Sequence, residues 1–299
     1  MTIERSQISI QFVVLIICLF CLSLKAQADE PKRKGYSFFG IGLSLVDYEE
    51  NSTVAIDGVV IDVETDTASI ITQSSGAFTY VNPRWGFYLQ TLSTLGVPKS
   101  SESWEHNDVI VQGNSVSFRF QRLALLGSRR LKQKQNHLLF GLQYGNFEYR
   151  RFGGRFTDAA EQIGVDESSF PTGTISETVW DVTALIGIER TNLFNTNKAG
   201  WQYQGRLLLG TPLMSSVVNT AVEDGRSFSN SFNGLEMQAQ ALIAYQFNPH
   251  FMIAASLEIS ANRRDAISTR TRAQNTDNAF PSTTFVSVLP SVSAHWSLK

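Results

Sequence analysis

Cysteine is nearly absent from this chain. Of its 299 residues only Cys18 and Cys21 are cysteines, and both lie in a leader segment that we expect to be removed. The absence of cysteine from residues 29–299 therefore excludes a disulfide scaffold, a cysteine-ligated zinc site and a cysteine nucleophile.

The leader is residues 1–28. It has an early arginine (Arg5), an uninterrupted apolar run at residues 12–22, and Ala-Gln-Ala immediately before Asp29. This is the layout of a secretory signal peptide with its cleavage site. The alternative is an uncleaved membrane helix, but the run of 11 residues falls short of the roughly 20 that span a bilayer. We expect cleavage after Ala28 and a single domain over residues 29–299.

Long hydrophobic runs and an excess of basic charge are also lacking. No stretch after residue 28 approaches 18 consecutive apolar residues, so no membrane-spanning helix is expected. Without the leader, 23 basic side chains (25 minus Arg5 and Lys25) stand against 26 acidic ones (27 minus Glu4), a net charge of −3. This balance gives no electrostatic reason to expect nucleic acid as a partner.

The sequence has instead a strict alternation of apolar and other residues, with a period of two. From Leu235 to Phe247 every odd position is apolar, with Glu236 and three glutamines among the even ones. After the turn at residues 248–250 the alternation resumes to residue 261. Alternate residues of a strand point to opposite sides, so the pattern predicts a long antiparallel hairpin that is apolar on one side.

Similar segments recur along the chain. We expect ten strands, at residues 35–56, 59–81, 84–95, 114–126, 137–152, 174–190, 201–214, 235–247, 251–261 and 282–298. The connections after the second, fourth, sixth and eighth are short, whereas those after the third, fifth, seventh and ninth, including residues 96–113, are long loops. Asp57-Gly58 is typical of a two-residue type I′ turn. Because the first two strands exceed twenty residues each, their outer halves should stand above the membrane as a ribbon.

The last strand carries a family resemblance. Val288, Pro290, Val292, Ala294, Trp296 and Leu298 alternate toward an aromatic residue near the end. With this strand the chain resembles the bacterial outer-membrane β-barrel class over residues 35–299. The resemblance implies an antiparallel up-and-down transmembrane β-barrel in the outer membrane, with both ends periplasmic. Its implied partners are outer-membrane lipid and lipopolysaccharide, and the barrel-assembly machinery during biogenesis. Eight or twelve strands, and a soluble secreted barrel, remain alternatives.

In such a barrel the apolar side faces lipid, and the polar side faces the lumen. We expect these side chains to line the lumen, as a narrow pore or as a core of ion pairs: Arg119, Asp181, Arg206, Glu236, Gln238, Gln240 and Glu258. The same alternation directs Val116, Phe118 and Phe120 toward lipid. It also directs Arg122 there, which conflicts with the cost of roughly 2–4 kcal/mol for an arginine at the bilayer midplane. Either a bulge that shifts the register or snorkelling of the side chain would resolve the conflict.

Catalytic signals are weak. The four histidines, His106, His137, His250 and His295, have no nucleophile motif beside them, and His106 with Asp108 is the nearest approach to an acid–histidine pair. Acidic residues near Asp57 and Asp62 lack the spacing of a calcium loop. We therefore expect no catalytic residue, metal or cofactor, and a non-enzymatic outer-membrane protein, either structural or a narrow channel. A surface recognition or adhesion barrel acting through its loops, and an outer-membrane hydrolase, are the alternatives.

Overall fold

The computed structural model describes residues 35–298 except 52–53, 57–58, 97–98, 133–134, 163–172, 195–197, 221–225, 230–233, 266, 271–276 and 281. The expected signal peptide lies outside the described residues, as does the expected turn at Asp57-Gly58. None of the described helices is long and apolar enough to cross a membrane.

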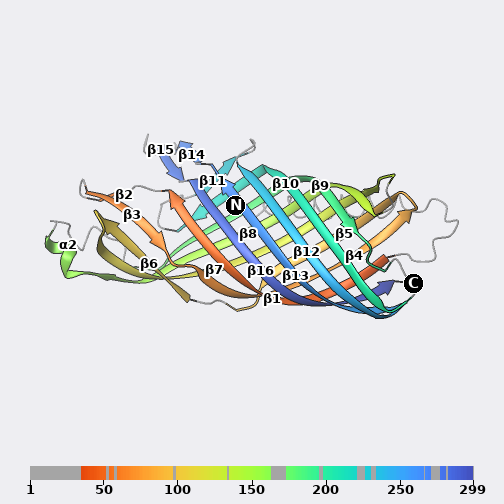
Figure 1. Ribbon diagram of the computed structural model, residues 1–299. Helices are drawn as coiled ribbons and strands as arrows, with labels where there is room; N and C mark the ends of the chain where they lie inside the picture. Colours follow the sequence, from red (N-terminus) through yellow and green to blue (C-terminus); the bar gives the residue numbers. More distant parts are fainter. Residues whose placement is uncertain are drawn as a thin grey trace, which may run out of the picture.

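Ten antiparallel strands close into a ring (Figure 1). In ring order they are β1 (Gly35–Asn51), β4 (Ala68–Asn82), β5 (Trp85–Thr94), β7 (Val109–Arg130), β8 (Asn136–Phe156), β9 (Ile175–Thr191), β10 (Gly200–Asn219), β12 (Leu235–Asn248), β13 (Phe251–Arg264) and β16 (Ser282–Leu298). β16 pairs with β1 from Gly35↔Leu298 onward, so the first and last strands close the ring. The predicted ten-stranded antiparallel barrel is confirmed.

The two ends of the barrel differ, as the connection lengths predicted. At the end that we call the short-turn end, the strands are joined at residues 83–84, 131–135, 192–199 and 249–250. β1 begins and β16 finishes at this end, where Figure 1 marks the C-terminus. The opposite, long-loop end carries the remaining elements: β2 (Val54–Ile56), β3 (Val59–Thr65), β6 (Lys99–His106), α2 (Asp158–Gln162), β11 (Arg226–Ser229), β14 (Ile267–Arg270) and β15 (Asp277–Phe280).

Two expectations about the long-loop end are wrong. The tip of the first hairpin pairs as expected, since Ile56 of β2 lies opposite Val59 of β3. The hairpin is not one continuous ribbon, because β1 ends at Asn51 and the rest of β3 pairs with β6 rather than with β1. Residues 96–113 are not a loop, because they contain β6 and the beginning of β7. β6 and β7 join through Asn107 and Asp108, whose φ angles of 49° and 64° are those of a type I′ turn. The turn lacks the usual glycine, so the sequence did not reveal it.

The outside of the barrel is apolar around its middle. Large exposed hydrophobic side chains include Phe39, Ile41, Ile186, Ile188, Leu207, Leu209 and Ile243. They lie on the faces that the alternation assigned to lipid. Near the short-turn end, aromatic rings form a continuous series of contacts from Trp201 through Tyr245, Phe247 and Phe251 to Trp296, with centroids 5.1–6.1 Å apart. An aromatic girdle of this kind is typical of the membrane interface.

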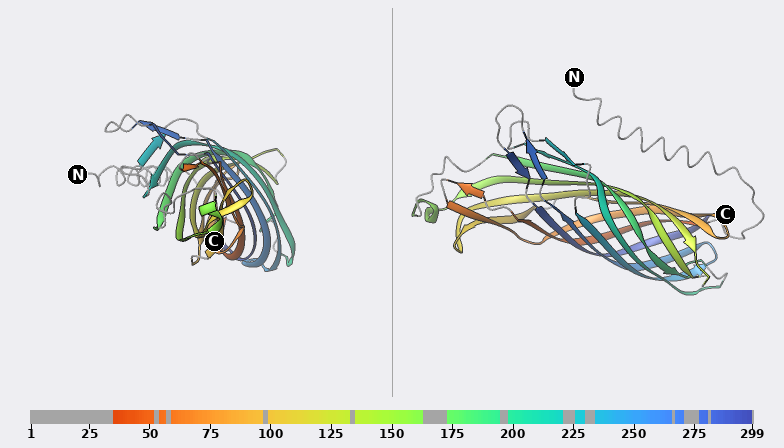
Figure 2. Two further views of the ribbon diagram at one scale, coloured as in Figure 1. Left: turned by 90° about the vertical axis from the view of Figure 1, so that its left-hand side faces the viewer. Right: turned by 90° about the horizontal axis from the view of Figure 1, so that it is seen from above.

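The interior has apolar side chains toward both ends and a polar band between them. Toward the short-turn end, Tyr36, Phe78 and Tyr88 belong to one buried cluster. Toward the long-loop end, a second cluster contains Tyr48 and Phe118. Along β1 the residues between the clusters are small, including Gly40, Gly42 and Ser44. The end-on view in Figure 2 shows the strands surrounding this interior.

Candidate functional site: a polar septum and two chambers in the lumen

An ion pair crosses the lumen. Arg122 extends from β7 and donates to Glu258 on β13, with 2.5 Å between Nη2 and Oε1. β7 and β13 stand on opposite sides of the ten-stranded ring, so the pair bridges the interior rather than joining neighbouring strands. The side chains retain 16% and 19% of their surface exposed.

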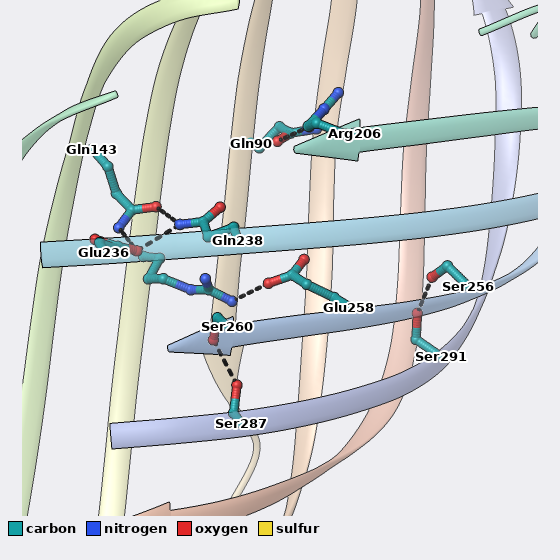
Figure 3. Close-up of polar contacts among 11 residues, drawn as sticks. Gln90, Gln143, Arg206, Glu236, Gln238, Ser256, Glu258, Ser260, Ser287 and Ser291 are labelled. Carbon is teal, nitrogen blue, oxygen red and sulfur yellow. Dashed lines mark hydrogen bonds and ion pairs between the residues drawn. The ribbon is translucent and has the colours of Figure 1, made fainter. Parts of the chain in front are cut away.

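A second polar bridge lies beside this pair (Figure 3). Gln143 on β8 donates to Glu236 Oε1 on β12 at 2.7 Å. Gln238 donates to Glu236 Oε1 at 2.6 Å and to Gln143 Oε1 at 2.7 Å. We call these five residues, Arg122, Glu258, Gln143, Glu236 and Gln238, the septum. Apart from the Gln238–Glu236 bond within β12, its bonds join strands that are not neighbours in the barrel wall.

A third polar cluster is centred on Glu189, toward the short-turn end. Arg206 donates to Glu189 Oε2 at 2.6 and 2.9 Å through Nη2 and Nε, and Tyr88 donates its hydroxyl to Oε1 at 2.5 Å. The side chains of Arg206 and Glu189 are 5% and 0% exposed. Arg206 also reaches across to Gln90 Oε1 on β5 at 2.7 Å. The buried charge is thus fully paired, as a charge in a low-dielectric interior requires.

The septum separates two cavities. The inner chamber, about 80 Å³, lies toward the short-turn end and is lined by residues that include Tyr36, Gln90, Gln204, Gln240 and His295. The outer chamber, about 90 Å³, is lined by residues that include Tyr48, Phe120, Phe147, Asp181, Arg264 and Phe285. Arg122 and Gln143 line both chambers. The septum therefore divides these two small spaces with polar side chains.

Six of the seven expected lumen residues lie inside the barrel. Asp181 and Glu236 line the outer chamber, Gln238, Gln240 and Glu258 line the inner one, and Arg206 is in the Glu189 cluster. The structure brings Glu236, Gln238 and Glu258 into the septum. It leaves Asp181 outside the septum and Arg206 on its inner side.

The seventh, Arg119, is a correction. Its side chain is 52% exposed on the outside of β7, 3.7 Å from Glu148. The inward residues of β7 are instead the even ones, including Phe118, Phe120 and Arg122. Outward residues are apolar at Leu123 and Leu125 but polar at Arg119 and Gln121. The strand of 22 residues leaves the apolar belt, and beyond the belt a polar outside and an apolar inside are favoured.

Sequence reasoning therefore missed Arg122, the central residue of the septum. One signal in the sequence could have revealed its position. If Phe120 faced lipid, strict alternation would place Arg122 in lipid as well, which is energetically costly. No bulge is needed to resolve it, because β7 keeps its alternation through residues 115–130 in its pairing with β8. Only the faces assigned to the outer half of β7 were wrong: its even-numbered residues point into the barrel, and not toward lipid.

Three histidines hydrogen-bond a serine, which is relevant to the hydrolase alternative. His137 Nδ1 lies 2.8 Å from Ser128 Oγ, His295 Nε2 lies 2.9 Å from Ser293 Oγ, and His250 Nδ1 lies 3.0 Å from Ser297 Oγ. The first two pairs are buried inside the barrel, and all three lie toward the short-turn end. His106 lies at the β6–β7 turn, where its Nε2 contacts Asn107 at 2.8 Å. Among the described residues, no group of three His, Cys, Asp or Glu is placed to hold a metal ion.

No protein-family model and no curated protein sequence matches this chain. Among solved structures, the outer membrane protease OmpT from Escherichia coli is similar with a TM-score of 0.66 and 12% identity, covering 92% of this chain and 100% of that one. OprG from Pseudomonas aeruginosa gives a TM-score of 0.37 and 9% identity over 89% and 97% of the two chains. Ail of Yersinia pestis gives 0.31 and 10% over 88% and 99%. The likeness to OmpT shows the fold, that of a bacterial outer-membrane β-barrel, as the C-terminal strand suggested.

Proposed function

We propose that this chain is a non-enzymatic outer-membrane protein of a Gram-negative bacterium, with a closed lumen and a structural role in the cell envelope. The short-turn end faces the periplasm, and the long-loop end faces outward. The observation that carries the proposal is the Arg122–Glu258 ion pair, which spans the lumen at 2.5 Å. A pore that conducts steadily cannot keep such a pair closed across its axis.

The dimensions of the barrel support a closed lumen. About eight strands leave an interior that side chains just fill, whereas porins with an aqueous channel have about 16–18. Ten strands therefore add little space. Aromatic side chains occupy the interior on the outer side of the septum, with Tyr48 stacked on Tyr149 at 5.0 Å and on Phe147 at 5.5 Å.

A non-enzymatic role agrees with the placement of the titratable groups. A general base needs an oriented partner and access to its substrate. Of the three Ser–His pairs, Ser128–His137 and Ser293–His295 are buried within the barrel. OmpT is a protease, but an identity of 12% carries no activity to this chain.

A narrow channel is the second candidate, and one observation favours it. Arg122 and Gln143 line both chambers, so movement of the septum alone would join them. In this candidate the septum is a gate, and Glu236 and Glu258 set the ion selectivity.

Single-channel conductance separates the two candidates. The mature chain, residues 29–299, is refolded and added to a planar bilayer, and heat-modifiable gel mobility shows that the barrel has folded. We expect a silent bilayer from the folded protein. Steady discrete openings whose selectivity changes in Glu236→Gln would establish the channel and overturn the structural proposal.

A further inference from the structure

Carboxylates outnumber guanidinium groups among the charged lining residues of the outer chamber and their ion-pair partners. Its charged lining residues are Arg122, Arg264, Asp181 and Glu236. Both arginines already have partners, since Arg122 pairs with Glu258 at 2.5 Å and Arg264 pairs with Glu177 at 3.3 Å. Within the described part of the chain, neither Asp181 nor Glu236 forms an ion pair. These six ionisable groups carry a formal charge of two positive and four negative, or −2.

Several buried polar atoms of the lining residues have no hydrogen-bond partner in the described protein. They are Glu236 Oε2, Asn146 Oδ1, Ser215 Oγ, and Arg264 Nε and Nη1. Glu236 is only 3% exposed and Ser215 only 1%, so bulk water does not solvate these side chains. Three of the five atoms accept hydrogen bonds. The chamber therefore offers acceptors for a ligand with N–H donors, and the guanidinium of Arg264 offers donors to an acceptor on the same ligand.

Aromatic rings form another part of the chamber wall. Phe120, Phe147 and Phe285 line it together with Tyr48. Phe285 packs edge to face on Phe147 at 5.1 Å and on Phe120 at 5.8 Å. Faces of aromatic rings attract cations and bury apolar groups. The lining thus combines carboxylates with an aromatic surface.

The backbone leaves space for one of the carboxylates. A Cβ atom at Gly145 would lie 2.9 Å from Asp181 Oδ1, closer than Cβ atoms approach other atoms. Any larger residue on β8 at this position would displace the Asp181 carboxylate. Gly145 itself lines the chamber.

From these features we propose that the outer chamber is a binding site for a small organic cation that carries an ammonium group and an apolar or aromatic part. The ammonium lies between Asp181 and Glu236, and the apolar part lies against Phe120, Phe147 and Phe285. A volume of about 90 Å³ corresponds to roughly six to nine water positions at ~10–15 Å³ each, which suits a ligand of about that many heavy atoms. The inference does not depend on whether the septum ever opens.

The test uses three probes of similar shape and different charge. The mature chain, refolded in detergent micelles near pH 8.5, where the amine probe is still protonated, is titrated calorimetrically with phenethylamine, with phenylacetate and with 2-phenylethanol. Titration of protein-free micelles corrects for partition into detergent. We expect phenethylamine, the cation, to bind at least about tenfold more tightly than either other probe, because only it places positive charge beside the two carboxylates.

Variants locate the site. Asp181→Asn with Glu236→Gln should weaken phenethylamine binding by about tenfold or more. The matched control is Asp47→Asn with Glu148→Gln, which removes two carboxylates from the outer face of β1 and β8 and should leave binding unchanged. If the first variant lacks heat-modifiable mobility, Phe285→Leu serves instead, since it keeps every charge and should weaken binding through the lost ring.

Two results would overturn the proposal. One is equal binding of all three probes to the wild-type protein, which indicates partition into an apolar space. The other is phenethylamine affinity that stays unchanged in the folded variant with Asp181→Asn and Glu236→Gln, or that falls by the same factor in the control variant. Neither result bears on conductance, so failure of the cation site remains distinguishable from failure of the structural proposal.

Discussion

Arg206 faces Glu189 directly across the β9–β10 ladder, and the guanidinium lies 2.6 Å from the carboxylate. The two side chains are 5% and 0% exposed, so they are removed from solvent together. Tyr88 and Gln204 donate to the same carboxylate. This cluster ties β5, β9 and β10 together on the inner side of the septum.

Loss of the negative charge in this cluster should be costly. Glu189→Gln leaves Arg206 buried without a counter-ion, and we expect the free energy of unfolding to fall by about 3–5 kcal/mol. Glu148→Gln is the control, because its partner Arg119 is half-exposed at 3.7 Å and such pairs contribute about 0–1 kcal/mol. Urea unfolding in lipid vesicles, followed by tryptophan fluorescence, measures both. Equal effects in the two variants would show that the Arg206–Glu189 pair is not a major contributor.

The septum pair should behave as a coupled unit. Arg122→Met and Glu258→Gln should each destabilise the barrel by about 2–4 kcal/mol, because each leaves one charge in the lumen without its partner. The double variant should cost less than the sum of the two by at least about 1 kcal/mol. The same urea unfolding experiment completes the cycle. Additive effects would mean that the two side chains do not interact across the lumen.

The membrane-spanning part of the fold could be predicted from the sequence. From Leu235 to Phe247 the alternation gave the strand, its partner and its lipid-facing side, since β12 pairs with β13 through a two-residue turn. The rule rests on one physical condition, that the outside is hydrocarbon. β7 extends beyond that region, so Phe118 turns inward and Arg119 turns outward.

The cross-lumen contacts could not be predicted. Arg122 and Glu258 are 136 residues apart, and their contact depends on the order, tilt and closure of the strands between them. Alternation shows which residues point inward, but not at what height each meets a residue from the opposite wall. The separation of the lumen into two chambers depends on those heights.

The assignment of faces on β7 is testable by cysteine labelling, because residues 29–299 contain no native cysteine. In vesicles, Arg119→Cys should react rapidly with a membrane-impermeant maleimide, since position 119 lies on the polar outside. Leu123→Cys should react slowly, and a bimane attached there should be quenched by brominated lipid. Phe118→Cys should show neither behaviour because it is buried in the interior. Quenching by brominated lipid of a bimane at position 118, together with slow maleimide labelling at position 119, would restore the original assignment.

The turn between β6 and β7 gives a local prediction. Asn107 and Asp108 have φ angles of 49° and 64°, a left-handed conformation that costs a β-branched residue about 1–2 kcal/mol. Asn107→Val should therefore increase hydrogen exchange of the β6 amides by up to about tenfold, with little effect on the barrel. Asp108→Gly should slow that exchange, because glycine is favoured in type I′ turns. Ser101→Val, at an exposed position within β6, is the control, since valine suits an extended strand. Unchanged exchange in Asn107→Val would mean that this turn does not limit the stability of β6.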